Sequence, residues 1–588
     1  MFQPVQQNLA QLYRVLGDYL RLKASLFEPV RGVDVEMRRL ALAQHNSQVV
    51  TALNIAKESI FSRLDARHSS QRMDRYLHLY FVAQDVHERA SSSHYPYGAL
   101  VDAFFHSDVM YRCQRLLGLQ GRACVRLARA IQLRQPFAQA PENAQAMDDL
   151  HSAITHLRAQ ARPEWRELLG SLSALARNLG TLDAQLAGAG RPRQEGSDAT
   201  TDSSLFDRSP RTWRDALARV RGPRVRGQLA PSSIAACGKR GCQLARVRGQ
   251  LAPSSPVFRH AVRLSLALAA GYGLMHLIHA RQGYWILLTT VFVCQQSFGA
   301  TRKRVGQRVA GTLLGLVAGW AVLGLVPSLL LQAMLAVVAG VVFFTVRTSR
   351  YTLATGAMTL LVLLCFNQAG DNSYSLIMPR LVDTLLGSAI AVMAVFLVMP
   401  DWQGRRMHTV AAHAIHSHSR YLREIMQQYQ TGKRDDLAYR LARRNAHNAD
   451  AALSTALSNM LKEPGFVRRE GSSGLHFLVL SHTLLSYLSA LGAHRQQLDE
   501  DSSNAAISQA ADHIAAALDA VGSSLAQRGP AVVLDADAQA HEQALVADLE
   551  HLTQSRDSTN GLVLAQLALI CRQLGALRQQ AGGLLKLA

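Results

Sequence analysis

Several features that mark enzymes and disulfide-bonded proteins are missing from this sequence. The 588 residues contain no Walker motif, which argues against ATP hydrolysis by this chain. The 7 cysteines show no repeated spacing, which argues against a disulfide framework and fits a reducing cytoplasm. Cys237 and Cys242 are the one close pair, and no second pair follows them. We therefore expect no metal site, no cofactor and no enzyme activity.

Strand signals and a signal peptide are also missing. No segment alternates apolar and polar residues convincingly, whereas apolar residues recur at spacings of three and four through most of the chain. The first thirty residues have no apolar core, because Arg14, Asp18, Arg21 and Lys23 interrupt it. The sequence therefore predicts an all-α protein that inserts into a membrane through later segments.

Acidic residues are outnumbered, and the excess positive charge restricts the partners. Sixty-three Lys and Arg face 42 Asp and Glu, which gives a net charge of +21. Such a balance occurs in nucleic-acid-binding proteins, but no recognised nucleic-acid-binding signature accompanies it. Because arginine is concentrated at the edges of apolar segments, we expect the charge to act at a membrane surface, with no nucleic-acid partner.

Long apolar segments fill the stretch from Pro256 to Pro400. A helix needs about 20 mostly apolar residues to cross a bilayer. The candidate spans lie at about 260–280, 284–300, 305–326, 328–346, 351–369 and 380–399. The second is the least certain in length and could be tilted or re-entrant. We predict a six-helix transmembrane domain over 257–400, embedded in the lipid bilayer.

Basic residues in the connecting segments predict the orientation of this domain. They follow the second, fourth and sixth spans, as Arg302, Lys303 and Arg304, then Arg347 and Arg350, then Arg405 and Arg406. Short loops rich in Lys and Arg stay on the cytoplasmic side. Both flanking regions, and with them both termini, should therefore be cytoplasmic.

The regions on both sides of the transmembrane domain are predicted to be helical domains, and a linker joins the first of them to the transmembrane domain. Residues 1–187 and 401–588 carry amphipathic helical patterns and should form two cytoplasmic domains. Residues 188–256 are rich in Gly, Ser, Thr and Arg at first and then repeat RVRGQLAPSS at 224–233 and 246–255. We interpret this segment as a flexible linker lengthened by a local duplication.

Asp383 and Arg380 are the most informative polar residues of the transmembrane domain. If the last span begins at 380, Asp383 lies about one turn inside its outer end. Charged groups at such positions are costly and usually face a pathway or a partner. Asp383 could carry protons or line a substrate path, or it could form an ion pair with Arg380 at spacing i,i+3.

Further pathway candidates lie near the edges of the spans. Arg263 and Arg308 could snorkel to the cytoplasmic surface or form a basic collar that attracts carboxylates. Gln295, Gln296 and Asn367 are polar groups near membrane depth that need partners, so we expect them to point inward. Tyr284 and Trp285 are typical of an interfacial aromatic belt.

Glycine recurs every four residues on one face of the third span, at Gly311, Gly315 and Gly319. Small residues at this spacing let helices approach closely in lipid. We predict a helix-packing surface there. In the N-terminal region, Asp85, His87, Glu88 and Arg89 carry acid and base groups without a nucleophile, and we expect them to form a buried polar contact between the cytoplasmic domains.

Three segments carry a resemblance to a known family. They are Phe81–His94, Gly283–Gln295 and Arg443–Asp450. In this order they resemble the YccS-type inner-membrane proteins of the fusaric acid resistance and aromatic acid exporter superfamily. The resemblance implies a bacterial inner-membrane protein in which two membrane bundles alternate with two cytoplasmic helical domains. Compared with this family pattern, we expect the first membrane bundle to be lacking in this chain. The duplicated RVRGQLAPSS segment is a second difference from the family pattern.

Two functions follow from these observations. The first is a transporter or efflux component for small organic or aromatic acids, which the resemblance and Asp383 favour. The alternative is a non-transporting scaffold or regulator that acts through its cytoplasmic helices, because cytoplasmic material makes up well over half of the chain. In either case we expect a homo-oligomer.

Overall fold

The computed structural model describes residues 3–190 and 255–587 with short gaps. The gaps are 29–34, 65–70, 93–96, 161, 163–164, 279–282, 348–349, 370–373, 401, 433–436, 465–470, 494–497, 499–502, 531–535 and 555–558. Cys237, Cys242 and nearly all of the predicted linker lie outside the described residues. The described residues form helices and no strand, which confirms the all-α fold.

The chain divides into two compact units. One unit contains the described residues of 1–224, 404–458 and 469–588, and the other contains those of 225–403 and 459–468. The predicted cytoplasmic segments 1–187 and 401–588 thus share one unit, which we call the helical unit. The second unit, which we call the membrane block, contains the helices of the predicted transmembrane domain.

The first half of the helical unit contains seven α-helices. They are α1 (Gln3–Ala24), α2 (Val35–Leu64), α3 (Gln71–Ser92), α4 (Tyr97–Ala103), α5 (Val109–Leu133), α6 (Pro141–Ala159) and α7 (Arg166–Gly188). Helix α5 runs through Gly118 and Gly121 without a break. Gly121 does not end the helix because it packs directly against Gly17 of α1, where a Cβ added to Gly17 would lie 2.7 Å from the Gly121 carbonyl oxygen.

The second half supplies six more helices to the same unit. They are α16 (Met407–Thr431), α17 (Leu437–Met460), α18 (Gly471–Ala493), α19 (Ser503–Gln527), α20 (Ala536–Gln554) and α21 (Thr559–Leu587). Helix α18 packs against α2 and α3 of the first half as well as against α16 and α21. The two halves are therefore joined by packing, although the membrane block separates them in sequence.

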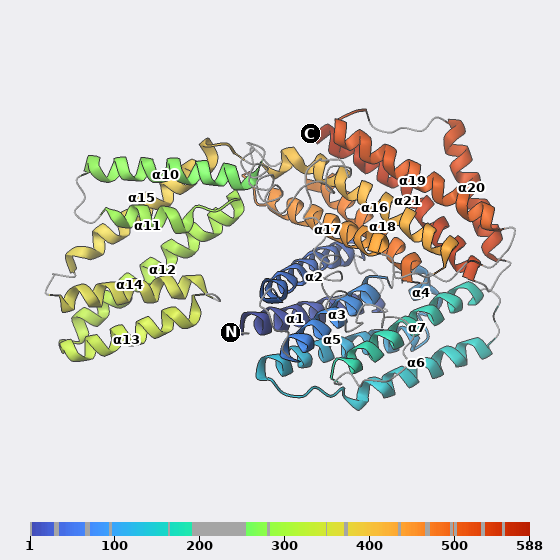
Figure 1. The fold of residues 1–588 in the computed structure, drawn as a ribbon, viewed down its shortest axis with the longest axis horizontal. Coiled ribbons are helices and arrows are strands. Elements are labelled where there is room, and N and C mark those ends of the chain that lie inside the picture. Colours follow the sequence, from blue (N-terminus) through green and yellow to red (C-terminus); the bar gives the residue numbers. More distant parts are fainter. Residues whose placement is uncertain are drawn as a thin grey trace. The chain divides into compact units, whose positions relative to one another are not determined.

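The membrane block places one helix at each predicted span. The helices are α10 (Pro256–Ile278), α11 (Tyr284–Val293), α12 (Phe298–Leu325), α13 (Leu329–Val346), α14 (Tyr351–Gln368) and α15 (Tyr374–Leu397). Contacts connect α13 to α14, α14 to α12, α12 to α15, and α15 to both α11 and α10, and Figure 1 shows this order. Apolar side chains of α13 such as Leu330, Val337 and Phe344 are exposed, as lipid-facing positions should be.

Seven described helices are long and apolar enough to cross a membrane. Five belong to the membrane block, namely α10, α12, α13, α14 and α15. The other two are Ser473–Gly492 in α18 and Asn560–Leu585 in α21, whose apolar windows are 78% and 56% buried by neighbouring helices. Because their apolar surface is already covered by protein, we assign these two to the core of the helical unit.

Three span boundaries differ from the predicted ones. Helix α11 has ten residues, about 15 Å at 1.5 Å per residue, which is half of a bilayer core. Helix α12 begins at Phe298, so the predicted basic loop belongs to its first turns. Helix α15 begins at Tyr374 and continues through Pro379. In each case the apolar pattern marks the bilayer-facing part, whereas hydrogen bonding decides where the helix begins or ends.

Candidate functional site

Three of the charged side chains that are buried inside the membrane block lie on α12 and α15. Arg308 of α12 is 7% exposed, and Arg380 and Asp383 of α15 are each 6% exposed. Because α15 begins at Tyr374, Asp383 lies nine residues inside, about 13 Å along the helix axis. Asp383 is thus close to the middle of the 24-residue helix and not one turn from its end. The structure brings these three predicted residues together.

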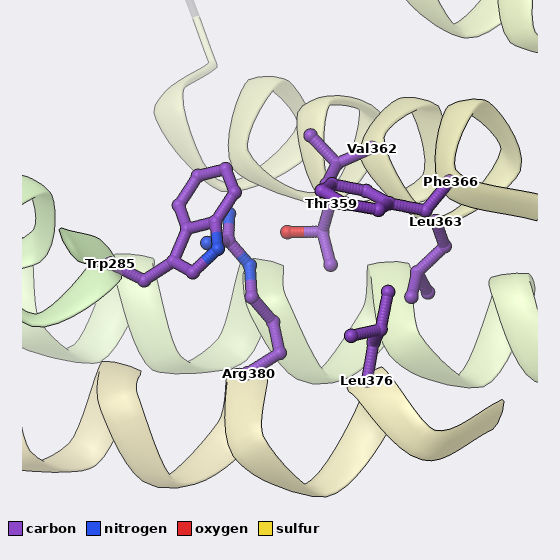
Figure 2. Close-up of a pocket in the computed structure, with 7 residues that line it drawn as sticks. All are labelled: Trp285, Thr359, Val362, Leu363, Phe366, Leu376 and Arg380. Carbon is purple, nitrogen blue, oxygen red and sulfur yellow. The ribbon is translucent and has the colours of Figure 1, made fainter. Parts of the chain in front are cut away.

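The guanidinium of Arg380 stacks on an aromatic ring and makes no hydrogen bond with the residues that the structure describes. Its central carbon lies 3.4 Å from the centre of the Trp285 ring. Figure 2 shows the two side chains beside each other. The buried Nε and Nη1 atoms have no partner among the described residues. A buried guanidinium whose donors lack acceptors is costly in free energy. Such an arrangement persists at sites where a ligand supplies the missing acceptors.

The predicted ion pair between Arg380 and Asp383 does not form. No oxygen of Asp383 comes within 4.0 Å of a nitrogen of Arg380, and the Asp383 carboxylate has no hydrogen-bond donor among the residues that the structure describes. Arg380 nevertheless lies within electrostatic range of both Asp383 and Arg308. The set therefore combines two positive charges and one negative charge, which leaves a net charge of +1.

A small pocket opens beside Arg380. It encloses about 10 Å³, roughly the space that one water molecule requires. Figure 2 shows its lining, which is Trp285 from α11, Leu376 and Arg380 from α15, and Thr359, Val362, Leu363 and Phe366 from α14. The walls are thus aromatic and aliphatic, with one guanidinium and one hydroxyl.

Buried hydroxyl groups without partners occur on the same helices. The side-chain oxygens of Thr289, Thr355 and Ser388 are buried and form no hydrogen bond within the described chain. The buried Nε of Arg308 is also without a partner, while its guanidinium lies 5.8 Å from the Phe292 ring. Polar groups at membrane depth normally pair within the protein. These buried polar groups lie on α11, α12, α14 and α15 and make the interior between these helices partly polar.

Arg263 has a structural role that the sequence did not predict. It is 1% exposed, so it neither snorkels nor forms an open collar. Its guanidinium donates to the carbonyl oxygens of Val398, Met399 and Gln296, at 3.2, 3.0 and 3.1 Å. These carbonyls belong to the end of α15 and to the non-helical segment after α11. Arg263 therefore satisfies irregular backbone that would otherwise be unpaired in the membrane.

Arg263→Gln should lower the thermal stability of the protein and leave ligand binding by the folded fraction intact. Losing three charge-assisted hydrogen bonds and exposing their acceptors should cost about 2–4 kcal/mol. Thermal unfolding in detergent measures the effect. Arg302→Gln, which removes an exposed arginine on α12, is the matched control and should change the melting temperature little. Equal melting temperatures for the two variants would contradict the proposal that Arg263 stabilises the irregular backbone.

The predicted amides lie at the ends of the helices. Gln295 and Gln296 follow the end of α11, and Gln296 is exposed, so the prediction that both point inward is wrong for Gln296. The Gln295 side chain donates to the Phe292 carbonyl at 3.3 Å. Asn367 donates to Gln332 of α13 at 2.7 Å, and Gln332 in turn donates to the Val326 carbonyl at 2.7 Å. These contacts tie helix ends together, and none of the three amide side chains lines the Arg380 pocket.

The glycine stripe of α12 faces α14. A Cβ added to Gly311 would lie 2.5 Å from the Thr352 carbonyl oxygen, and one added to Gly319 would lie 2.5 Å from a methyl carbon of Leu363. The backbones therefore approach more closely than larger residues allow. This packing holds α14, which carries much of the pocket wall, against α12, which carries Arg308.

Two contributors to the site were not predicted as such. Trp285 was expected in an interfacial belt, but it is half-buried and covers Arg380, whereas Tyr284 is 72% exposed and remains compatible with a belt. Gly387 of α15 was not singled out, yet a Cβ there would lie 2.6 Å from the Ile286 carbonyl oxygen. This close contact sets α11, and hence Trp285, against α15. In the sequence, the feature that could have identified this contact is a glycine one helical turn after Asp383.

Comparisons with known proteins give consistent matches over most of the chain. Residues 1–186 match the family described as FUSC-like inner membrane protein yccS, and residues 268–394 match Fusaric acid resistance protein-like. The chain is 41% identical over 500 residues to Inner membrane protein YccS of Escherichia coli K12. It is 37% identical over 497 residues to an uncharacterized protein of Haemophilus influenzae. Each alignment covers 84% of this chain and 65% of the relative.

A more distant relative matches a shorter part. Uncharacterized protein YhfK of Escherichia coli K12 is 30% identical over 214 residues, which is 36% of this chain and 30% of that protein. The chain spans slightly less than two thirds of the length of the two nearer relatives described above. The two family matches fall in the first half of the helical unit and in the membrane block. The chain belongs to the fusaric acid resistance protein-like (FUSC) family, as a YccS-type inner membrane protein.

Proposed function

We propose that the membrane block binds a small aromatic monoanion at Arg380 and takes part in moving it across the inner membrane. The observation that carries this proposal is the buried guanidinium of Arg380, which has no acceptor within the described chain. A carboxylate fits a guanidinium through two parallel hydrogen bonds. Transport by FUSC-family membrane proteins agrees with such a site in the membrane.

Charge and shape both favour an aromatic carboxylate. The net charge of +1 on Arg308, Arg380 and Asp383 is balanced by a ligand with one negative charge. Trp285 and Phe366 provide rings against which an aromatic ligand can pack. The name of the matching family refers to fusaric acid, which is itself an aromatic carboxylic acid.

The pocket must widen before such a ligand enters. Its enclosed volume of about 10 Å³ holds a water molecule and no aromatic ring. The lining comes from α11, α14 and α15, so a movement of α14 away from α15 opens it. Pro379 removes one backbone hydrogen bond directly beside Arg380, which makes α15 easier to bend there. We propose that this region moves during the transport cycle.

Ligand binding to the purified chain tests the site. Benzoate at pH 7.5 should raise the melting temperature in detergent and give a saturable binding isotherm by calorimetry, because a ligand that binds only the folded state stabilises it. Benzamide is the matched control, since it keeps the ring and planar head group but carries no charge. Equal effects of benzoate and benzamide, or no effect of either at millimolar concentration, would overturn the proposed anion site.

Flux across vesicles tests transport and the role of Asp383. The probe is labelled benzenesulfonate, which stays charged and does not leak through the bilayer as a neutral acid. If Asp383 carries protons, Asp383→Asn should abolish flux driven by a pH gradient and preserve ligand binding, because Asn keeps the size but cannot ionise. The longer YccS of Escherichia coli serves as a second sample. Binding without flux in both proteins would favour the regulator function instead.

The orientation of the membrane block remains a prediction that cysteine labelling can test. In a variant without native cysteines, an impermeant maleimide added to intact cells should label Ser328→Cys, which follows α12 at the uncharged end. Lys303→Cys should be protected until the cells are opened, because basic segments stay cytoplasmic. Both sites are exposed in the structure, so burial by protein does not explain a difference in labelling between them. The reverse labelling pattern would invert the topology.

A further inference from the structure

We propose that the contact between the two halves of the helical unit is a proton-operated latch, closed while His87 and His447 are neutral and opened when they are protonated. This contact, which we call the seam, joins α2 and α3 to α17 and α18. It brings together the Arg443–Asp450 segment and residues 81–92, the described part of the other cytoplasmic segment that carries the family resemblance. The inference is independent of the transport proposal.

The seam is polar and almost completely buried. His87 and His447 are 3% and 6% exposed, and their ring centres lie 5.4 Å apart in an edge-to-face arrangement. Glu88 forms an ion pair with Arg443 across the seam. The Ser47 hydroxyl donates to the Ala451 carbonyl at 3.3 Å. The predicted buried contact of the His87 segment is therefore observed between the two halves.

Each histidine is held in its neutral form by its surroundings. His87 Nε2 lies 2.8 Å from the Asn46 side-chain oxygen, and His447 Nε2 lies 3.4 Å from the Ser489 hydroxyl. His447 Nδ1 is buried and has no partner among the described residues. An imidazolium carries two N–H donors. Protonated His447 would thus bury a donor that has no acceptor, which favours opening to water.

Neighbouring charges add to this preference for neutral rings. The charged and titratable groups that face the pair are Tyr19 and Lys23 (α1), His418 (α16), Arg443 (α17) and His482 (α18). Glu88 (α3) and Asp450 (α17) lie behind them, against Arg443 and His482. Glu88 is engaged by Arg443, and Asp450 accepts from Ser481 and lies 3.0 Å from His482. Both of these acids are therefore already engaged and do not directly pair with two imidazolium rings 5.4 Å apart.

The direction of the pH effect follows from these contacts. Burial, together with Arg443 and other cations, lowers the pKa of His87 from 6.5 to about 3, and it lowers the pKa of His447 well below 6.5. The closed seam consequently binds fewer protons than the open one. Its stability is full above about pH 6.5 and is lost as the pH falls toward 3. Burial lowers the Lys23 pKa to about 7, so Lys23 changes its protonation state at a higher pH than the range in which the histidines do.

The seam continues by sequence toward the membrane block. Helix α17 carries Arg443, His447 and Asp450, and the residues from Asn459 onward group with the membrane helices. Lys462, just after α17, lies against Gly299 at the start of α12, where an added Cβ would be 3.1 Å away. Helix α17 thus runs from the seam residues to a segment that groups with the membrane helices.

Hydrogen exchange of the intact chain in detergent tests the latch. After correction for the intrinsic pH dependence of exchange, protection in α2, α3, α17 and α18 should fall between pH 6.5 and 5, while α12 and α14 stay protected. For each histidine that gains a proton on opening, the open fraction should rise by up to about tenfold for every unit by which the pH is lowered. The two seam histidines together should give up to about 100-fold per unit.

The double variant His87→Gln and His447→Gln should remove this 100-fold dependence and shift opening to lower pH. His551→Gln, which removes an exposed histidine of α20, is the matched control and should behave like the parent protein. If the double variant fails to fold, the parent protein alone decides, because simultaneous loss of protection in the seam and the membrane helices would indicate general acid unfolding. That result, or an unchanged pH dependence in a folded double variant, would overturn the latch.

Discussion

Arg380→Met should bind benzoate at least about tenfold more weakly than the parent protein and should melt at the same or a higher temperature. A charge-assisted hydrogen bond contributes about 1.5–3 kcal/mol, which corresponds to roughly 10–150-fold in affinity. Methionine fills similar space beside Trp285 and needs no hydrogen-bond acceptor. Removing a buried guanidinium whose Nε and Nη1 have no hydrogen-bond acceptor in the described chain relieves a desolvation cost that exceeds the lost stacking on Trp285, so stability is maintained or gained.

Two further variants make this result specific to the site. Arg302→Met removes an exposed arginine from the same block and should leave both affinity and melting temperature unchanged. Arg263→Gln should show the opposite pattern, with lower stability and retained affinity, because each of its three guanidinium nitrogens donates to a carbonyl within the protein. A fall in melting temperature with unchanged benzoate affinity for Arg380→Met would assign Arg380 a structural role and refute the proposed site.

Gly315→Leu should destabilise the membrane block by about 3 kcal/mol or more. A Cβ at this position would lie 2.5 Å from the Gly356 carbonyl oxygen and 2.7 Å from the Thr359 Cβ. Backbone atoms cannot move aside as a side chain does, so α12 and α14 must separate and lose dispersion contacts along the interface. Thermal unfolding in detergent should show a decrease of roughly 6–12 °C.

Gly306→Leu is the matched control for this change. Gly306 lies on the same helix, is exposed, and has no atom within 4 Å of an added Cβ. Its melting temperature should stay within about 2 °C of the parent protein. Benzoate binding should also weaken in Gly315→Leu, because Thr359 lines the Arg380 pocket. Similar stability of the two variants would show that the stripe does not need close packing.

The sequence by itself determined the helical class, the position of the membrane block and the family. Apolar periodicity and span length depend only on residues near one another in the chain, so the helix positions could be read locally. The spacing of Gly311, Gly315 and Gly319 likewise identified a packing face. The same local pattern could not define the ends of α11, α12 and α15, because capping and tertiary hydrogen bonds decide where a helix stops.

Only the tertiary structure decided which polar residues have partners. Arg263 and Arg380 look alike in sequence, yet one is saturated by three carbonyls and the other stacks on Trp285 without an acceptor in the described chain. His87 and His447 are 360 positions apart and become neighbours across the seam. Helical periodicity records which face of a helix is apolar, whereas the partner of a polar group depends on how separate helices pack. That packing is a property of the whole fold, and it distinguishes the structural arginine from the candidate binding site.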